Sequence, residues 1–531
     1  MSNAESKQRK KGQSAVIPTG EEFQQKVIAA YRAGKGADIL PSDEAAARSL
    51  IPPGTAALRD FSYISPEFPA LDAEKCVGCM ECVTKCPDTA ILAKVVAKSE
   101  LEKRLAAVKD ADERERLRRH FAQTTKFYGG PEKKGEEGGL FGLFVDVSKC
   151  KGCAECVEVC GTHEALSMTR KTPPTVEAYK RDFAFFKELP DTPARYINEK
   201  VLADIMLAER ALLYVGGAGS CMGCGEATAI RMMLAATGFV YGPENVAIVA
   251  ATGCNTVYGS SYPFNPYLVP WTNSLFENAV SDAMGIRLRW NQMGWQDKRL
   301  WTMGGDGAIL DIGFGALSRL LASGMDIKVL VLDTQVYSNT GGQASTATYT
   351  GQDAEMAPFG AAIAGKQERR KELGIIAMMH PNVFVAQTIT ADINHFYRSI
   401  MAANEFKGPA VVSVYCACQP EHQIADDQSS HQARLAKDSR TFPIFVYDPR
   451  NGSSIKERLS LQGNPSMKQD WHIDPKTEEP LDFIAFARTE GRFAKQFDKD
   501  GNPSEVLLAA QQDRLEYWRL LQELAGLRSV M

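Results

Sequence analysis

The sequence predicts an α/β protein in which a parallel sheet forms the larger, later part of the chain and a small α+β domain precedes it. Two observations support this. From about residue 210, short apolar runs end at glycine or aspartate and alternate with helical segments, as in ENVAIVAATGC and MDIKVLVLDTQ, a pattern typical of buried parallel strands. Between residues 71 and 172, one cysteine-rich pattern occurs twice.

The length and composition narrow the possible classes of protein. With 531 residues, the chain is long enough for two or three domains. A net charge of −4, with no basic patch, argues against a nucleic-acid-binding protein. The amino terminus is basic without a following apolar stretch, and no run of about 18 apolar residues occurs, so we expect a cytoplasmic protein without a membrane span. Thirteen cysteines in that compartment favour metal ligation or catalysis over disulfides.

Changes in composition and residue pattern divide the chain into five segments. Residues 1–70 form a polar lead-in with a helical stretch at Glu21–Arg32, and residues 173–209 form a linker. The repeated cysteine region, 71–172, contains an insert at 95–140 that we expect to be a solvated helix and loop, or alternatively an interaction arm. The sheet domain spans 210–438. A carboxyl-terminal extension, 439–531, ends in a helix at Pro503–Leu527 and is expected to pack on the core or on a partner chain.

The repeated cysteine pattern is C-x2-C-x2-C-x3-C, typical of two-cluster ferredoxins. In such proteins three cysteines of one motif bind one [4Fe–4S] cluster and the fourth binds the other cluster. The predicted groups are therefore Cys76, Cys79, Cys82 and Cys160 for one cluster, and Cys150, Cys153, Cys156 and Cys86 for the second. Pro87 follows the first motif as expected, whereas Gly161 replaces the second proline. Tetrahedral zinc is the alternative, which two tandem quartets at this spacing disfavour.

A second motif, GGDG at 304–307, follows an apolar run and precedes a helical stretch. Its glycines let backbone N–H groups approach a diphosphate, and Asp306 offers a carboxylate to Mg²⁺, although Gly-Asp-Gly is also an ordinary turn. Twenty-eight residues later, Thr334 ends the next predicted strand. The loops after two neighbouring strands can thus bring Asp306, the Thr334 hydroxyl and the Val336 carbonyl to one Mg²⁺ that bridges a diphosphate.

Five more cysteines follow strand-like runs, in SCMGCGE, ATGCN and VVSVYCACQP. Loops at one edge of a parallel sheet converge, so four of these sulfurs can bind a third cluster. The alternative is a set of scattered buried thiols.

Together these motifs resemble the pyruvate:ferredoxin oxidoreductase family. The segment GDGAILDIGFGAL…DTQVYSNTGGQASTAT carries the resemblance, which covers residues 70–440 and includes the order of the two domains. It implies a parallel-sheet thiamine-diphosphate-binding domain of the PP type, preceded by a two-[4Fe–4S] ferredoxin-like domain. It also implies a third [4Fe–4S] cluster on Cys221, Cys224, Cys254 and Cys418, with Cys416 as a spare thiol.

The resemblance further implies which residues contact thiamine diphosphate and which chemistry follows. These contacts are Glu226, Cys254, Gly305, Asp306, Gly307, Ala308, Thr334, Val336, Tyr337, Ser338 and Asn339. Asn339 matches a catalytic residue that faces the reacting carbon, although asparagine also favours turns. The implied reaction is oxidative decarboxylation of pyruvate to acetyl-CoA and CO2, with electrons passing one at a time through three clusters to ferredoxin or flavodoxin.

The chain lacks recognisable counterparts of the family's pyrimidine-binding, substrate-binding and coenzyme A domains, so the resemblance implies a partner subunit that carries them. We expect a hetero-oligomer, a dimer of protomers, that is inactive without the partner. Three alternatives stay open: another 2-oxoacid such as 2-oxoglutarate as substrate, an electron carrier fused to a non-catalytic thiamine-like domain, and a non-oxidative decarboxylase. The seven histidines are scattered, and none suggests a general base.

Overall fold

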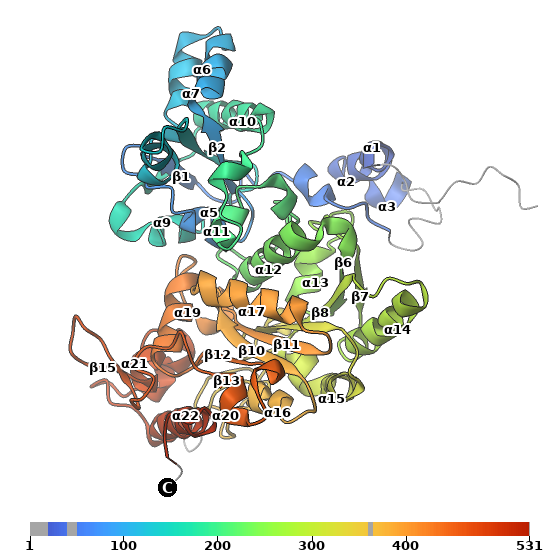
Figure 1. Ribbon diagram of the computed structural model, residues 1–531, viewed down its shortest axis with the longest axis vertical. Helices are drawn as coiled ribbons and strands as arrows, with labels where there is room; N and C mark the ends of the chain where they lie inside the picture. Colours follow the sequence, from blue (N-terminus) through green and yellow to red (C-terminus); the bar gives the residue numbers. More distant parts are fainter. Residues whose placement is uncertain (1–19, 40–49, 359–364, 530–531) are drawn as a thin grey trace, which may run out of the picture.

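The later part of the chain is built around an eight-stranded sheet, as Figure 1 shows for a computed structural model that describes residues 20–39, 50–358 and 365–529. The strand order is β13-β12-β10-β11-β9-β8-β6-β7, and the six strands from β6 to β11 are mutually parallel. Their bounds are β6 (Val246–Ala251), β7 (Trp271–Ser274), β8 (Arg299–Gly305), β9 (Lys328–Asp333), β10 (Phe384–Ile389) and β11 (Ala410–Tyr415). The predicted α/β fold class is confirmed.

Helices cover both faces of this sheet, because alternate residues of each strand point to opposite sides. One face packs against α12 (Gly225–Tyr241) and α17 (Ile393–Glu405). The other packs against α14 (Asn278–Gln292), α15 (Phe314–Ser323), α16 (Leu373–Met378) and α22 (Glu505–Leu524). Every residue of β6, β9, β10 and β11 is buried, which explains why the sequence shows continuous apolar runs rather than alternation.

The cysteine-rich unit lies above the face covered by α12 and α17 (Figure 1). In it, β1 (Glu67–Leu71) pairs antiparallel with β5 (Leu166–Arg170), and β4 (Gly139–Val145) lies between β2 (Ile91–Ala97) and β3 (Phe121–Ala122). Each cysteine motif contains a short helix, α5 (Glu81–Lys85) or α9 (Glu155–Glu158), and the two helices are in contact. The predicted small α+β domain is confirmed, although its first strand begins inside the segment assigned to the lead-in.

The insert at 95–140 and the linker at 173–209 differ from the prediction. The insert holds α6 (Lys98–Ala107) and α7 (Ala111–Arg118), and it then adds β3 to the sheet. The supposed linker begins with α10 (Pro173–Glu188), whose Phe183 and Phe186 pack on Leu101, Leu105 and Leu117 of the insert. The thin apolar stripe of the insert thus has an aromatic partner, so both segments belong to the folded unit.

The two ends of the chain also pack on the sheet domain. A continuous helix formed by α1 (Gly20–Phe23), a π-helical turn and α2 (Ala29–Arg32) confirms the predicted stretch, and it packs against Tyr262 and Phe264. Residues 1–19 and 40–49 of the lead-in lie outside the described residues. The extension supplies β12 (Phe445–Tyr447) and β13 (Leu459–Ser460) to the sheet, so the predicted boundary at 438 divides one domain.

The remaining short elements complete the inventory. They are α3 (Gly36–Ile39), α8 (Gly130–Glu132), α11 (Leu202–Ile205), α13 (Cys254–Gly259), α18 (Gln419–His422), α19 (Ser429–Asp438), α20 (Ile455–Arg458), α21 (Phe483–Ala487), β14 (His472–Ile473) and β15 (Pro480–Leu481).

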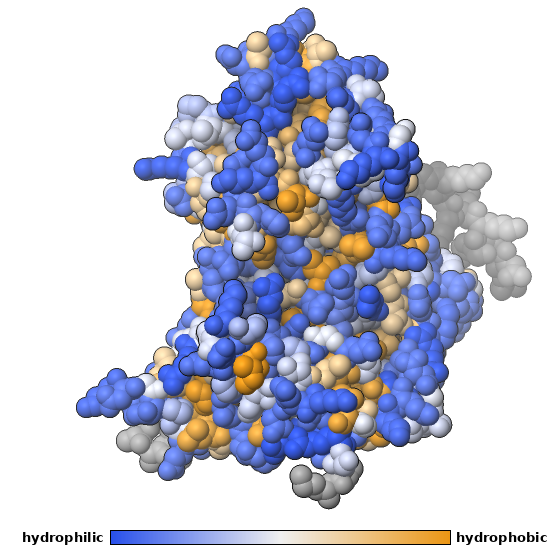
Figure 2. Space-filling model, turned by 60° about the vertical axis from the view of Figure 1, so that its left-hand side comes forward, coloured by the Kyte–Doolittle hydropathy of each residue, from blue (hydrophilic) through white to orange (hydrophobic). Residues whose placement is uncertain are grey.

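Figure 2 shows a mostly hydrophilic surface with apolar patches where the upper and lower parts meet. Among the described residues, no helix has both the length and the apolar character needed to cross a bilayer.

Candidate cofactor and cluster sites

Eight cysteines of the cysteine-rich unit, the upper unit in Figure 1, gather around two separate hollows of similar size. One hollow, of about 350 Å³, is lined by Cys76, Cys79, Cys82 and Cys160. The other, of about 340 Å³, is lined by Cys86, Cys150, Cys153 and Cys156. The structure therefore brings together the same two groups that the motif spacing predicts, each with its fourth cysteine from the other motif.

The local backbone explains how each loop turns its sulfurs inward. Gly78 and Met80 in the first motif, and Gly152 and Ala154 in the second, adopt positive φ angles of 70°, 70°, 77° and 63°. Left-handed residues at matching positions curl each C-x2-C-x2-C segment around its hollow.

The chemistry of these cysteines fits an iron–sulfur cluster. Burial, and then neighbouring cysteines, raise the pKa of Cys82 and of Cys156, and burial followed by Cys86 raises the pKa of Cys150 to about 12. A positively charged iron core would supply the counter-charge that buried thiolates need.

A third cysteine group lies at the carboxyl edge of the large sheet. Cys221, Cys224, Cys254 and Cys418 line one hollow of about 520 Å³. They come from three places: the loop before α12, the start of α13 after β6, and the loop after β11. Cys416 does not line the hollow; it is fully buried, and its thiol donates to the Val414 carbonyl over 3.4 Å. The convergence of loops expected from the sequence is thus present, with Cys416 outside it.

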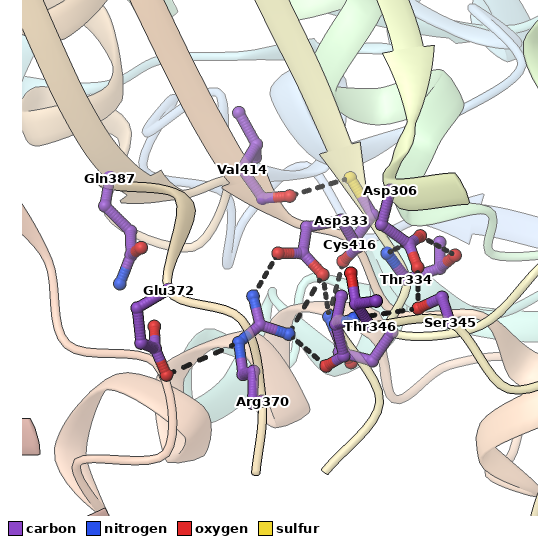
Figure 3. Close-up of polar contacts among 12 residues, drawn as sticks. Asp306, Asp333, Thr334, Ser345, Thr346, Arg370, Glu372, Gln387, Val414 and Cys416 are labelled. Atoms are coloured by element: carbon purple, nitrogen blue, oxygen red, sulfur yellow. Dashed lines mark hydrogen bonds and ion pairs between the residues drawn. The ribbon is translucent and has the colours of Figure 1, made fainter. Parts of the chain in front are cut away.

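The residues predicted to bind Mg²⁺ lie together at the ends of the adjacent parallel strands β8 and β9 (Figure 3). The Thr334 hydroxyl is 3.2 Å from Asp306 Oδ1 and 3.1 Å from the Val336 carbonyl. Ser345 donates a hydrogen bond to Asp306 Oδ2. Burial, followed by the charge of Asp333, raises the pKa of Asp306 to about 7. A divalent cation would supply the positive charge that this buried carboxylate lacks, so the oxygen donors fit Mg²⁺.

Beside this group lies a buried ion pair that the sequence analysis missed. Asp333 ends β9, and Arg370 donates to both of its carboxylate oxygens (Figure 3). Arg370 also lies 3.8 Å from Glu372 and donates to the Ala347 carbonyl. The two partners are 37 residues apart in the sequence, so no local spacing could have identified them.

A cleft of about 760 Å³ contains all the predicted thiamine-diphosphate contacts. It is lined by Glu226, Cys254, Gly305, Asp306, Gly307, Ala308, Thr334, Val336, Tyr337, Ser338 and Asn339, together with Thr252, Gly253, Phe276, Ile312 and Thr340, which the sequence analysis missed. A Cβ atom at Gly307 would lie 2.4 Å from the Tyr337 ring, so only glycine leaves room there. Burial raises the pKa of Glu226 to about 8, while the Tyr258 hydroxyl, 3.3 Å away, donates to its carboxylate.

The cleft and the third cysteine group share a wall. Both are lined by Glu226, Cys254, Thr334, Ser338 and Asn339. The second group adjoins the third, because Lys151, next to Cys150, pairs with Asp88 at 2.6 Å and donates to the Ser220 carbonyl, next to Cys221, over 2.6 Å. Cys82 of the first group interacts electrostatically with Cys156 of the second. The cleft and the three cysteine groups therefore follow one another in a row, and the last group includes the exposed Cys79.

Buried charges fix the upper unit to the sheet domain beside the cysteines. Arg231 of α12 donates to the Val83 and Thr84 carbonyls over 2.6 and 3.1 Å. Glu155 of α9 accepts from two N–H groups at the start of α19, those of Ser429 and Ser430, over 3.0 and 2.9 Å. Because these contacts lie within a few residues of the cysteines, they set the spacing between the second and third groups.

Comparisons with known proteins agree with this arrangement. Residues 251–414 match the model of the thiamine pyrophosphate enzyme C-terminal TPP binding domain, and residues 69–92 match that of the 4Fe-4S binding domain. The chain therefore combines an iron–sulfur domain and, after it, a thiamine-pyrophosphate-binding domain.

Full-length relatives give the same picture. A probable pyruvate-flavodoxin oxidoreductase of Escherichia coli is 30% identical over 85% of this chain and 42% of its own length. The pyruvate-flavodoxin oxidoreductase of Rhodospirillum rubrum is 27% identical over 95% of this chain and 45% of its own length. The pyruvate:ferredoxin oxidoreductase of Moorella thermoacetica is 26% identical over 96% of this chain and 46% of its own length. The chain thus spans less than half the length of these curated relatives.

Among solved structures, the 2-oxoglutarate:ferredoxin oxidoreductase from Magnetococcus marinus aligns with a TM-score of 0.33 at 20% identity. The alignment covers 38% of this chain and 65% of that one.

Proposed function

Starting from the kinship of this chain with the pyruvate-flavodoxin and pyruvate:ferredoxin oxidoreductases, we propose that it is the thiamine-binding and electron-relay part of a 2-oxoacid oxidoreductase. The observation that supports this best is the wall shared by the cleft and the third cysteine group. An acceptor held there would lie next to the reacting atoms. The two remaining cysteine groups continue the row to the surface.

The residues of the cleft have separable roles in this proposal. Thiamine diphosphate, when bound, supplies an electron sink for the decarboxylation of a 2-oxoacid. Asp306, Thr334 and Val336 would hold a Mg²⁺ beside its diphosphate, and the glycines on either side of Asp306 would let backbone N–H groups come close. Glu226 and Asn339 line the inner wall, where Asn339 orients the substrate. The three cysteine groups would hold [4Fe–4S] clusters, which would supply one-electron acceptors between the cleft and ferredoxin or flavodoxin.

The rest of the active site is proposed to come from a partner subunit. The relatives are more than twice as long as this chain, and the pyrimidine-binding, substrate and coenzyme A domains are assigned to the partner. Exposed apolar side chains support a covering surface, because Ile312 of the cleft and Val257 of the adjoining third cysteine hollow expose 60% and 51% of their surface. Pyruvate is the proposed substrate, since the relatives named for a substrate act on pyruvate and the loop NTGGQ resembles that branch.

Anaerobic co-purification from the native host tests the assembly. The expected result is a larger partner, bound thiamine diphosphate, and about 12 iron atoms per chain, four for each of three clusters. Recovery as a lone chain without thiamine diphosphate would instead favour an electron carrier with a non-catalytic domain. Turnover of 2-oxoglutarate but not of pyruvate by the complex would contradict the proposed substrate.

Two cysteine variants test the third cluster. C418S should lower the iron content from about 12 to about 8 atoms per chain, whereas the matched variant C416S should leave it at about 12. The opposite pattern would show that the ligand is Cys416. In the same complex, D306N should abolish thiamine-diphosphate binding while all three cluster signals persist, because Asp306 lines the cleft but none of the three cysteine hollows.

A further inference from the structure

A buried histidine, His422, lies beneath both loops that form the shared wall. It ends α18, the short helix that follows Cys418, and it is completely buried. Its Nε2 atom is 2.9 Å from the Thr334 carbonyl, and its Nδ1 atom is 3.4 Å from the Cys418 amide nitrogen. Because a carbonyl only accepts and an amide N–H only donates, Nε2 carries the proton and Nδ1 is unprotonated.

This ring is the second of two bridges between the same loops. On the cleft side, the Ser338 hydroxyl is 2.6 Å from the Thr334 hydroxyl and also forms a hydrogen bond to the Cys418 sulfur. On the opposite side, His422 joins the backbone of Thr334 to the backbone of Cys418. The cation-binding loop and the loop of the fourth sulfur are therefore linked at both the side chain and the main chain.

The carboxyl-terminal extension holds this arrangement from below. Glu490, which follows α21, is buried, and its Oε1 atom accepts a hydrogen bond from Tyr415 over 2.9 Å and lies 3.7 Å from His422 Nδ1. Arg492 donates to Glu490 Oε2 over 2.5 Å and to the Gln335 side chain over 3.1 Å. Gln335 is adjacent to Thr334 and has a left-handed φ of 60°. The extension thus contacts both loops through one buried acid–base pair.

We propose that His422 is a positioning residue that sets the thiamine-diphosphate site and the third cluster relative to each other, and that Glu490 and Arg492 of the extension fix the two loops around it through Tyr415 and Gln335. The inference rests on the proposed function. It has two parts: the Nε2 contact shapes the cation loop, and the Nδ1 contact keeps the Cys418 N–H turned away from the cluster. Hydrogen bonds to cluster sulfurs alter the reduction potential, so release of that N–H changes the potential.

Two substitutions separate these contacts, because an asparagine oxygen replaces Nδ1 and a glutamine nitrogen replaces Nε2. H422N keeps the acceptor for Cys418 and loses the donor to Thr334. It should weaken thiamine-diphosphate binding about 5- to 10-fold, the effect of one lost hydrogen bond, with the third-cluster potential unchanged. H422Q keeps the donor to Thr334 and loses the acceptor for Cys418. The freed Cys418 N–H should then turn toward a cluster sulfur and raise the third-cluster potential, while thiamine-diphosphate binding stays near wild type.

The measurements are made on the complex with its partner, by equilibrium dialysis of thiamine diphosphate and by redox titration followed by electron paramagnetic resonance. E490Q should both weaken thiamine-diphosphate binding, as H422N does, and raise the third-cluster potential, as H422Q does, but each effect should be smaller. H395N, which changes a partly buried histidine elsewhere in the sheet domain, is the control and should move neither. The potentials of the two ferredoxin-type clusters should stay constant throughout.

The outcomes separate this inference from the proposed function. If wild-type complex contains only about 8 iron atoms per chain, the third cluster and the proposed function are wrong. If it contains about 12 and neither H422N nor H422Q moves binding or potential, His422 is an ordinary core residue and the inference is wrong. Equal shifts of all three cluster potentials would also overturn it, because they indicate a general loss of packing.

Discussion

Replacing Arg370 by methionine is expected to destabilise the sheet domain strongly, although Arg370 does not line the cleft. Its guanidinium and the Asp333 carboxylate are 2% and 1% exposed, and the arginine donates to both oxygens of that carboxylate. R370M leaves Asp333 buried and unpaired beside Asp306. Removing one partner of a buried ion pair costs about 3–5 kcal/mol, because the remaining charge keeps its desolvation penalty.

A domain of this size loses about 2–4 °C in Tm for each kcal/mol, so R370M should lower the melting temperature by roughly 6–20 °C. Thermal unfolding followed by tryptophan fluorescence reports on this domain, because Trp301 and Trp518 are buried in it. The neighbouring variant R369M is the control. Arg369 is 65% exposed and pairs with Glu516 at the surface, so its loss should cost less than about 1 kcal/mol.

A double-mutant cycle with D333N tests the cause. D333N alone removes the charge that Arg370 faces, but leaves that arginine its contacts to the Ala347 carbonyl and Glu372, so we expect a loss of about 1–3 kcal/mol. The double variant D333N/R370M has no buried, unpaired carboxylate at position 333 and should be more stable than R370M. The reasoning would be refuted by a Tm shift for R370M below about 3 °C, or by losses that simply add.

Three further predictions concern other buried contacts. Burial lowers the pKa of His395 from 6.5 to about 4, so the folded state binds fewer protons than the unfolded state between those values, and stability falls as the pH drops through that window; at pH 5 the loss is about 2 kcal/mol relative to pH 7. H395N should reduce this loss in melting curves at the two pH values, and an unchanged slope would contradict it. E155A removes the acceptor for two N–H groups of α19 and should speed hydrogen exchange over 429–433, whereas E155Q, which keeps one acceptor oxygen, should have a smaller effect; equal rates in wild type and E155A would exclude a docking role. F186A opens the buried contact between α10 and the insert and should lower the unfolding free energy of the upper unit by about 3–5 kcal/mol; a change below about 1 kcal/mol would show that the insert is not packed on it.

The parts of this protein that could be predicted from sequence are those whose geometry is local. The spacing within each cysteine motif determines how its loop curls, and the glycines around Asp306 determine how closely the backbone can approach a ligand. Neighbouring parallel strands end at the same edge of a sheet, so the approach of Thr334 to Asp306 follows from strand order alone. The structure accordingly brings each ferredoxin-type group together around one hollow, whereas the members of the third group and most cleft residues were implied by the family resemblance rather than by local spacing.

The parts that escaped prediction depend on contacts distant in sequence. Phe183 and Phe186 look like a linker helix until the insert supplies leucines to cover them. Asp333 meets Arg370, and His422 meets Glu490, only through tertiary packing. These buried charges have no periodicity and no fixed spacing, so a single sequence carries no signal for them. The boundary at 438 failed for a related reason, since β12 pairs with β10 across an intervening strand and three helices.

That boundary leads to a last prediction. A chain that ends at Asp438 is expected to be insoluble, because it loses β12 and β13 and leaves β10, whose residues are all buried, as an exposed edge strand. It also loses Trp518 and Leu521 of α22, which are fully buried against the sheet, and Glu490 and Arg492. A chain that ends at Leu524, the last residue of α22, keeps all of these and is the control. Soluble expression of the 438 truncation with thiamine-diphosphate binding intact would show that the extension is dispensable. Recovery of solubility without thiamine-diphosphate binding would place its contribution in the contacts beneath Thr334 rather than in the sheet.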